Sequence, residues 1–157
     1  MTNPATPATP STPSTLRIEA DLGRLKDVRR FVREVAPGLG ADEAAVRDLV
    51  QAVDEWVTNV VVHGYRGAGG PIEVELLRSG DEIVARVRDA APAFDPATAP
   101  AFDPSLPLDR RPAGKIGIHL IRALCDRFEH RVPAGGGNEN AIVRSTRTAP
   151  SRTGGNA

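Results

Sequence analysis

The sequence predicts an α+β domain, a two-layer α/β sandwich in which a mixed or antiparallel sheet carries its helices on one face. Three observations support this fold class. A long apolar stripe at helical spacing runs through residues 42–63, and two alternating segments at 72–77 and 82–88 are typical of a hairpin. The order of elements lacks the regular βαβ alternation of a doubly wound domain. At 157 residues, the chain has room for one domain with its own core.

Composition and periodicity define the N-terminal elements. Residues 1–15 are rich in Pro, Thr and Ser and offer little to bury, so we expect a disordered tail. Residues 16–20 alternate as a strand does, and Asp21 can cap the helix that follows. A second helix is expected over residues 42–63. Its apolar stripe consists of Val46, Leu49, Val50, Val53, Val57, Val60 and Val61.

The second half of the chain holds the predicted hairpin and a long connection. Residues 89–114 are rich in proline and lack periodicity, and we interpret them as a mobile lid. The domain is expected to span 16–147, and residues 148–157 are expected to form a second disordered tail. The remaining elements are expected to be a helix at 116–126, a strand at 128–132 and, after a glycine-rich turn, a strand at 141–146.

Charge and hydropathy limit the partners and the compartment. Lys plus Arg and Asp plus Glu each number 20, so the chain lacks the positive field that holds a polyanion, and we expect no direct binding of nucleic acid. No stretch approaches the ~20 apolar residues of a membrane span, and no signal-peptide pattern is present, so a cytoplasmic protein is expected. The single cysteine, Cys125, excludes an internal disulfide and is expected to be an inert core thiol.

A row of polar residues on the second helix is the first candidate for chemistry. Glu55, Asn59 and His63 recur every four residues and therefore share one surface of the helix. A solvated face would account for such a row. Asparagine in a helix interior, however, costs roughly 0.5 kcal/mol relative to alanine. An amide oxygen suits Mg²⁺ bound to phosphates, and a nearby carboxylate can deprotonate a hydroxyl, so the row favours phosphoryl transfer.

Two later segments could contact a nucleotide. Asp89 ends a strand, where its carboxylate could accept a hydrogen bond from the exocyclic amine of a base or could simply cap a turn. Gly114-Lys115-Ile116-Gly117 precedes a helix, whose N-terminus could receive a phosphate. The chain contains neither a Walker A loop nor the glycine loop of protein kinases. Any ATP site must therefore have another design.

Taken together, these segments resemble a known family. Residues 52–65, Ala-Val-Asp-Glu-Trp-Val-Thr-Asn-Val-Val-Val-His-Gly-Tyr, resemble the N box of the anti-sigma factor serine kinase branch of the GHKL ATPases. Residues 89–96 resemble the next nucleotide box, and 114–122 resemble the last one, at the end of the ATP lid. The likeness extends over roughly 16–144 and implies a histidine kinase-like ATPase domain of the Bergerat type, with ATP and Mg²⁺ as its cofactors.

The resemblance implies roles for individual residues. Glu55 corresponds to the family's catalytic base, and Asn59 corresponds to its Mg²⁺ ligand. Asp89 corresponds to the carboxylate that contacts adenine. The other motif positions implied to lie at the nucleotide are His63, Ala91, Gly114, Lys115 and Gly117.

The sequence departs from the family pattern in two places. Ala91 and Ala93 replace both glycines of the usual Asp-x-Gly-x-Gly, and Lys115 follows Gly114 where the lid usually has paired glycines. An alanine methyl group can hinder close approach of the backbone or exclude a positive φ. We therefore expect these departures to weaken ATP binding without abolishing it.

The resemblance implies a regulatory kinase. The expected function is phosphorylation of a small STAS-type anti-anti-sigma protein and, in another complex, sequestration of a sigma factor. The alternative is a catalytically weak or inactive nucleotide-binding regulator that acts only by holding its partner. The histidine-kinase branch is disfavoured because no separate helix pair carries a phospho-acceptor histidine. The resemblance also leaves homodimerisation open.

Overall fold

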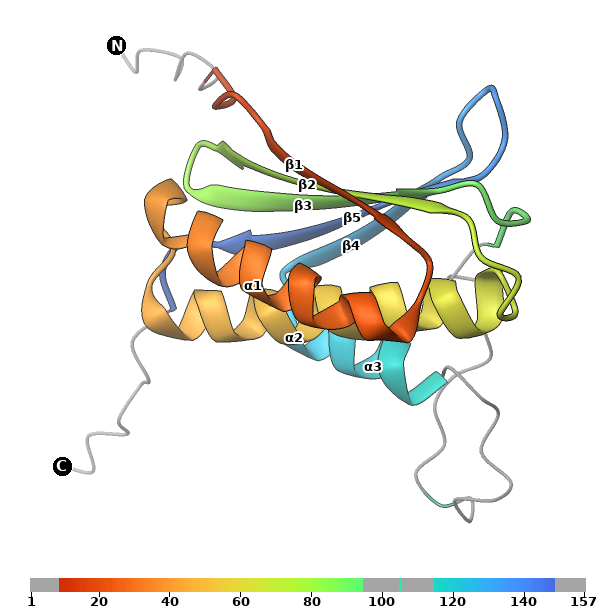
Figure 1. Cartoon of the computed structure of the whole chain (residues 1–157). Helices are drawn as coiled ribbons and strands as arrows, with labels where there is room; N and C mark the ends of the chain where they lie inside the picture. The colour runs from red at the N-terminus through yellow and green to blue at the C-terminus, as the bar shows by residue number, and fades with distance from the viewer. Residues whose placement is uncertain (1–8, 95–104, 106–114, 149–157) are drawn as a thin grey trace, which may run out of the picture.

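The computed structural model describes residues 9–94, 105 and 115–148, apart from the side chains of 115 and 116. Within this part of the chain, five strands form one antiparallel sheet in the order β1-β2-β3-β5-β4. Figure 1 shows the sheet as one layer and the three α-helices as a second layer on one of its faces. The two-layer α+β sandwich predicted from the sequence is confirmed, and its sheet is antiparallel throughout.

Aspartate side chains cap the 3₁₀ turn that precedes the first helix and the start of the second helix. Asp21 accepts a hydrogen bond from the amide of Gly23 and starts a 3₁₀ turn that leads into α1. Asp42 accepts one from the amide of Ala45 at the start of α2, 2.8 Å away. The helices are α1 (Leu25–Val35), α2 (Glu43–Asn59) and α3 (Lys115–Leu124).

The second helix does not keep its α-helical pattern to residue 63 as predicted. The α-helix ends at Asn59 and continues as a π-helical turn over Val60–Gly64, in which the amide of Tyr65 donates to the carbonyl of Val60. A π turn of this kind is rare and occurs often beside functional sites. The apolar stripe continues through it, since Val60 and Val61 are both buried.

Two contacts involve residues just outside the range 16–147 expected for the domain. The strand expected at 16–20 begins at Ser14, because its backbone pairs with Leu76 of the neighbouring strand. At the other end, the amide of Thr148 donates to the carboxylate of Asp42. The predicted lid lies mostly outside the described residues. The strands are β1 (Ser14–Glu19), β2 (Pro71–Ser79), β3 (Glu82–Asp89), β4 (Arg127–Arg131) and β5 (Asn138–Ser145).

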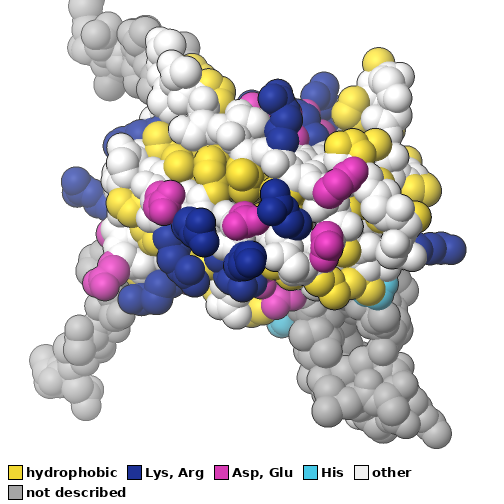
Figure 2. Space-filling view, viewed as in Figure 1, with side chains coloured by type: hydrophobic (Ala, Val, Ile, Leu, Met, Phe, Trp, Pro, Cys, Tyr) yellow, Lys and Arg dark blue, Asp and Glu magenta, His cyan; other side chains and the backbone are white. Residues whose placement is uncertain are grey.

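The two faces of the sheet differ in chemistry. One face packs on the helices and supplies apolar side chains such as Val74 and Val87, which are paired across β2 and β3 and fully buried. The other face carries an ion-pair ladder centred on Arg88, whose guanidinium contacts Glu73, Glu75 and Glu139. Seen from the side in Figure 2, acidic and basic side chains are interspersed, and the basic ones gather over α1 and α2.

None of the described helices has the length and apolar character needed to span a membrane.

Candidate functional site

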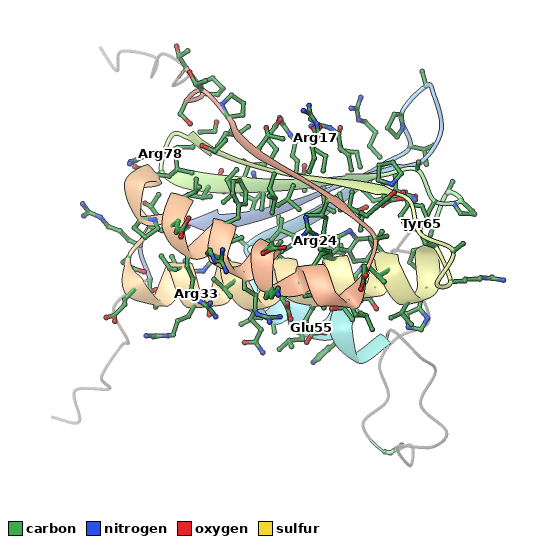
Figure 3. All side chains as sticks on the ribbon, viewed as in Figure 1. Arg17, Arg24, Arg33, Glu55, Tyr65 and Arg78 are labelled. Atoms are coloured by element: carbon green, nitrogen blue, oxygen red, sulfur yellow. The ribbon has the colours of Figure 1, made fainter. Side chains whose placement is uncertain are left out.

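Glu55 and Asn59 lie one turn apart on α2, and both side chains approach Gly117 in the first turn of α3. Figure 3 shows Glu55 on the side of α2 that faces α3. A Cβ atom at Gly117 would lie 2.9 Å from Asn59 Nδ2 and 3.2 Å from Glu55 Oε2. Only a residue without a side chain leaves both polar groups this space. The structure therefore brings together two members of the predicted polar row and one of the predicted lid glycines.

His63, the third member of the row, has a different environment. It lies in the π-helical turn and its side chain is exposed, whereas Glu55 and Asn59 are half-buried. No hydrogen bond or ion pair joins His63 to another described residue. The row predicted from the four-residue spacing thus holds for Glu55 and Asn59, and nothing in the described contacts ties His63 to them.

Asp89 ends β3, and the described residues occupy one of its two carboxylate oxygens. Its Oδ1 accepts hydrogen bonds from the Ala91 amide at 3.0 Å and from Asn138 Nδ2 at 2.9 Å, and no hydrogen bond from a described residue reaches Oδ2. Burial raises the pKa of the carboxyl, and the bonds from Asn138 and Ala91 partly oppose this increase. The free oxygen can accept a hydrogen bond from a ligand's amine.

Asn138, the first residue of β5, holds Asp89 and the chain after it. Its side-chain nitrogen also donates to the carbonyl of Pro92 at 3.1 Å, and its Oδ1 accepts from the amide of Phe94 at 2.8 Å. The side chain is only 4% exposed. Asn138 thereby fixes the rotamer of Asp89 and the path of residues 89–94 at once.

Two further residues, Gly137 and Tyr65, lie against the backbone beside Asp89. Gly137 has φ +77°, and a Cβ atom there would lie 2.1 Å from the carbonyl oxygen of Asp89. The hydroxyl of Tyr65 donates to the carbonyl of Pro71 at 2.6 Å and accepts from the amide of Ala90 at 2.7 Å. Figure 3 shows Tyr65 just beyond α2, at the end of the sheet where β3 finishes. These contacts link the end of the N-box segment to the strand end that carries Asp89.

The structure explains how two alanines replace the expected glycines. Neither Ala91 nor Ala93 has a positive φ, since Arg66 is the one non-glycine residue of the described chain that does. The Ala91 methyl is 3% exposed and lies 3.3 Å from the place where a Cβ of Gly64 would be. Gly64 therefore provides the space that the Ala91 side chain fills. Of the two reasons given for weaker ATP binding, the forbidden positive φ is not found at Ala91 or Ala93. The effect of the two alanines on ATP affinity stays a prediction.

The predicted phosphate end of the site is only partly described. Gly114 lies outside the described residues. Lys115 is the first residue of α3, and its side chain is likewise outside them. The proposed contacts of Gly114 and Lys115 with phosphate stay predictions.

Several buried polar atoms near this junction have no hydrogen-bond partner within the part of the chain that the structure describes. The amide nitrogen of Asn59 is one of them, although the great majority of buried polar groups in proteins are hydrogen-bonded. Trp56, the residue after Glu55, packs edge-on against Phe128 of β4, and its Nε1 has no hydrogen-bond partner among the described residues. Asn140 and His130, opposite each other on β5 and β4, are unpartnered as well. Orphaned donors and acceptors beside Asp89 and Asn59 fit a polar ligand such as a nucleotide.

Sequence reasoning missed Tyr65, Gly137 and Asn138 as members of this site. A signal for Asn138 was present: Asn is disfavoured in strands, yet Asn138 and Asn140 occupy alternate positions of one. The turn before them was recognised as glycine-rich, but its proximity to Asp89 depends on the pairing of β3 with β5. Tyr65 was recognised only as the last residue of a motif.

The antiparallel sheet with helices on one face, and the contact of Gly117 with Glu55 and Asn59, agree with the class of ATPase domain expected from the sequence. The chain matches the family model of the histidine kinase-like ATPase domain over residues 18–143 and belongs to that family.

The relatives are bacterial regulatory proteins. Over 110 residues, the chain is 32% identical to a serine-protein kinase RsbW from Listeria monocytogenes, and the match covers 67% of each chain. Over 120 residues, it is 30% identical to an anti-sigma F factor from a Thermoanaerobacter species, covering 76% of this chain and 81% of that one. The chain is thus a distant homologue of these anti-sigma factor kinases.

A solved structure has the same fold. The crystal structure of the RsbU and RsbW domains of Rv1364c from Mycobacterium tuberculosis matches 86% of this chain with a TM-score of 0.61 and 23% sequence identity. The match covers 32% of that chain, so this chain corresponds to about a third of it. At this level of identity the likeness concerns the fold alone.

Proposed function

We propose that this protein binds ATP with Mg²⁺ and phosphorylates a serine or threonine of a STAS-type anti-anti-sigma protein, and that it also sequesters a sigma factor. The observation that supports it best is the packing of Gly117 against Glu55 and Asn59, which unites the first and last motifs of the nucleotide site. Membership of an ATPase family and homology to a serine-protein kinase and an anti-sigma factor agree with this function.

The adenine base would be recognised at the end of β3. Asp89 Oδ2 is free to accept a hydrogen bond from the exocyclic amine, since Oδ1 is held by Asn138 and Ala91. Because both bonds are made before any ligand arrives, the carboxylate need not be ordered on binding. Preorganisation of this kind reduces the entropic cost of association.

The phosphates would lie between α2 and the start of α3. A bound Mg²⁺ would neutralise charge on the phosphate oxygens, and the Asn59 amide oxygen is a hard ligand suited to hold it. Glu55, one turn earlier, would accept the proton of the attacking hydroxyl. Positioning and charge neutralisation would supply most of the rate.

Calorimetry with ATP and Mg²⁺ tests the nucleotide site. We expect wild-type protein to bind ATP, and we expect Asn59→Ala and Asp89→Ala to lose most of that affinity. Matched controls are Gln51→Ala, an exposed position two turns before Asn59 on the same helix, and Asp81→Ala, whose carboxylate is 99% exposed in the β2–β3 turn. Absence of binding by the wild type, or equal loss in the controls, would contradict the assignment.

Phosphate transfer tests the kinase activity separately. Glu55→Gln preserves the shape of the side chain but removes the base, so transfer to a STAS-domain protein should fall by about 100-fold or more while ATP and partner binding persist. Unchanged transfer would show that Glu55 is not the base. If the wild type binds ATP and partner but transfers no phosphate, the protein is instead a regulator that acts by sequestration.

A further inference from the structure

Strand β5 carries two buried asparagines whose environments differ completely. Asn138 and Asn140 lie two residues apart, so their side chains point to the same face of the sheet, toward the helices. Asn138 is 4% exposed and uses both its amide oxygen and its amide nitrogen in hydrogen bonds. Asn140 is fully buried, and neither its Oδ1 nor its Nδ2 forms a hydrogen bond with any of the described residues.

An unpartnered amide in the core is costly, because it loses its hydrogen bonds to water and gains none in return. The position itself favours an apolar residue. Asn140 pairs with Val87 on β3, and the next residue on the same face of β5 is the buried Ile142. A valine at 140 would continue this pattern. The amide therefore opposes the stability of the unliganded fold, and a contribution to binding would explain its presence.

The unpartnered polar atoms form one group beside the proposed base site. His130, across from Asn140 on β4, has two unpartnered ring nitrogens and lies close enough to Asp89 for its charge to lower the pKa of that carboxyl. Trp56 approaches from α2, where its ring contacts Phe128 of β4. Glu55 precedes Trp56, and Asn59 follows within the next turn. His130 thus lies near the carboxylate predicted to bind the base, and Trp56 shares its helix with the residues predicted to act on the phosphates.

We propose that Asn140, together with His130, is a specificity-determining contact for the nucleotide base, made directly or through one bound water. This inference rests on the proposed ATP-binding function. An amide offers a donor and an acceptor side by side, which complements the ring nitrogen and amine of one edge of adenine. Asp89 would bind the amine from the other side with its free oxygen. The imidazole can donate to or accept from the same edge or the same water.

This inference predicts that Asn140→Val affects the stability of the fold and the affinity for ATP in opposite directions. Asn140→Val removes an amide that has no partner and places a strand-favouring side chain in the core, so the denaturation midpoint of the unliganded protein should stay the same or rise. The affinity for ATP should fall by about tenfold or more, the effect of losing one such hydrogen bond and leaving the base unpaired. His130→Leu should behave in the same way.

Asn138→Val is the matched comparison on the same strand and face. It breaks the bonds to Asp89, Pro92 and Phe94, so it should lower both the denaturation midpoint and the affinity for ATP. ATP affinity can be followed by the fluorescence of Trp56, the one tryptophan of the chain, and by calorimetry. Denaturation is measured by circular dichroism in the absence of nucleotide.

The outcomes separate the inference from the function on which it rests. Weaker ATP binding by Asn140→Val with an unchanged or raised midpoint supports the inference. Equal ATP binding by wild type and Asn140→Val would overturn it while leaving the ATP site intact. A midpoint lowered as much as in Asn138→Val would also overturn it, because Asn140 would then have a structural role. If the wild type binds no ATP, the proposed function itself fails and the inference fails with it.

Discussion

Replacing Gly137 by alanine should damage the fold and the base site together. Its backbone has φ +77°, a conformation that costs an L-residue about 1–2 kcal/mol. The new Cβ atom would also lie 2.1 Å from the carbonyl oxygen of Asp89, where real Cβ contacts stay beyond 3.0 Å. The turn and the strand end must therefore separate by about 1 Å, a form of overpacking that costs a further 1–3 kcal/mol or so. The free energy of unfolding should fall by about 2–5 kcal/mol.

Gly136 provides the matched control for this substitution. It has φ +89° and nothing within 4 Å of its hypothetical Cβ, so Gly136→Ala should show the backbone cost alone. Denaturant unfolding of the two variants gives the steric cost by difference, about 1–3 kcal/mol. Since the displaced atoms belong to Asp89, ATP affinity should fall only in Gly137→Ala. Equal destabilisation in the two variants would refute the reasoning.

Three further predictions concern other parts of the site. Gly117→Ala should raise helix propensity by about 1 kcal/mol yet weaken ATP binding, because the methyl group presses on Asn59 and Glu55; calorimetry and unfolding measure the two effects. Burial raises the pKa of the Asp89 carboxyl, so its ionisation opposes folding. The free energy of unfolding that protonated Asp89 contributes should be fully present below pH 3.8 and should be lost as the pH rises through the raised pKa. Denaturation midpoints of the wild type and of Asp89→Asn, measured across this pH range, test the prediction. Burial raises the pKa of Cys125 to about 11, so thiol reagents at neutral pH should react far more slowly with native than with denatured protein.

Local patterns predicted most of the elements because each depends on neighbouring residues. The valine stripe identified α2, and the alternating segments identified β2 and β3 to within two residues at each end. The π-helical turn at Val60–Gly64 was missed because its residues fit an α-helical stripe equally well. The start of β1 was missed because pairing with β2, and not composition, determines it.

The candidate site was predictable only in part, for a related reason. Glu55 and Asn59 lie within one turn of helix, so their spacing predicted a shared surface. Asn138 becomes a partner of Asp89 only through the register of β3 with β5, which no local pattern encodes. The contact of Gly117 with α2 likewise depends on how two helices pack. The resemblance to a family identified the motif residues. It could not identify the residues of this chain that form hydrogen bonds or packing contacts with them.

The strand order has a consequence for folding kinetics. β2 with β3 and β4 with β5 are hairpins with short turns, whereas β1 joins β2 and β3 joins β5 only after loops of about 50 residues have closed. Contacts of high sequence separation form slowly. Asp89 and Asn138 face each other across the second of these closures. The two hairpins can therefore form as separate units that cannot yet recognise a base, and nucleotide added during refolding should act only after the slow step that joins them.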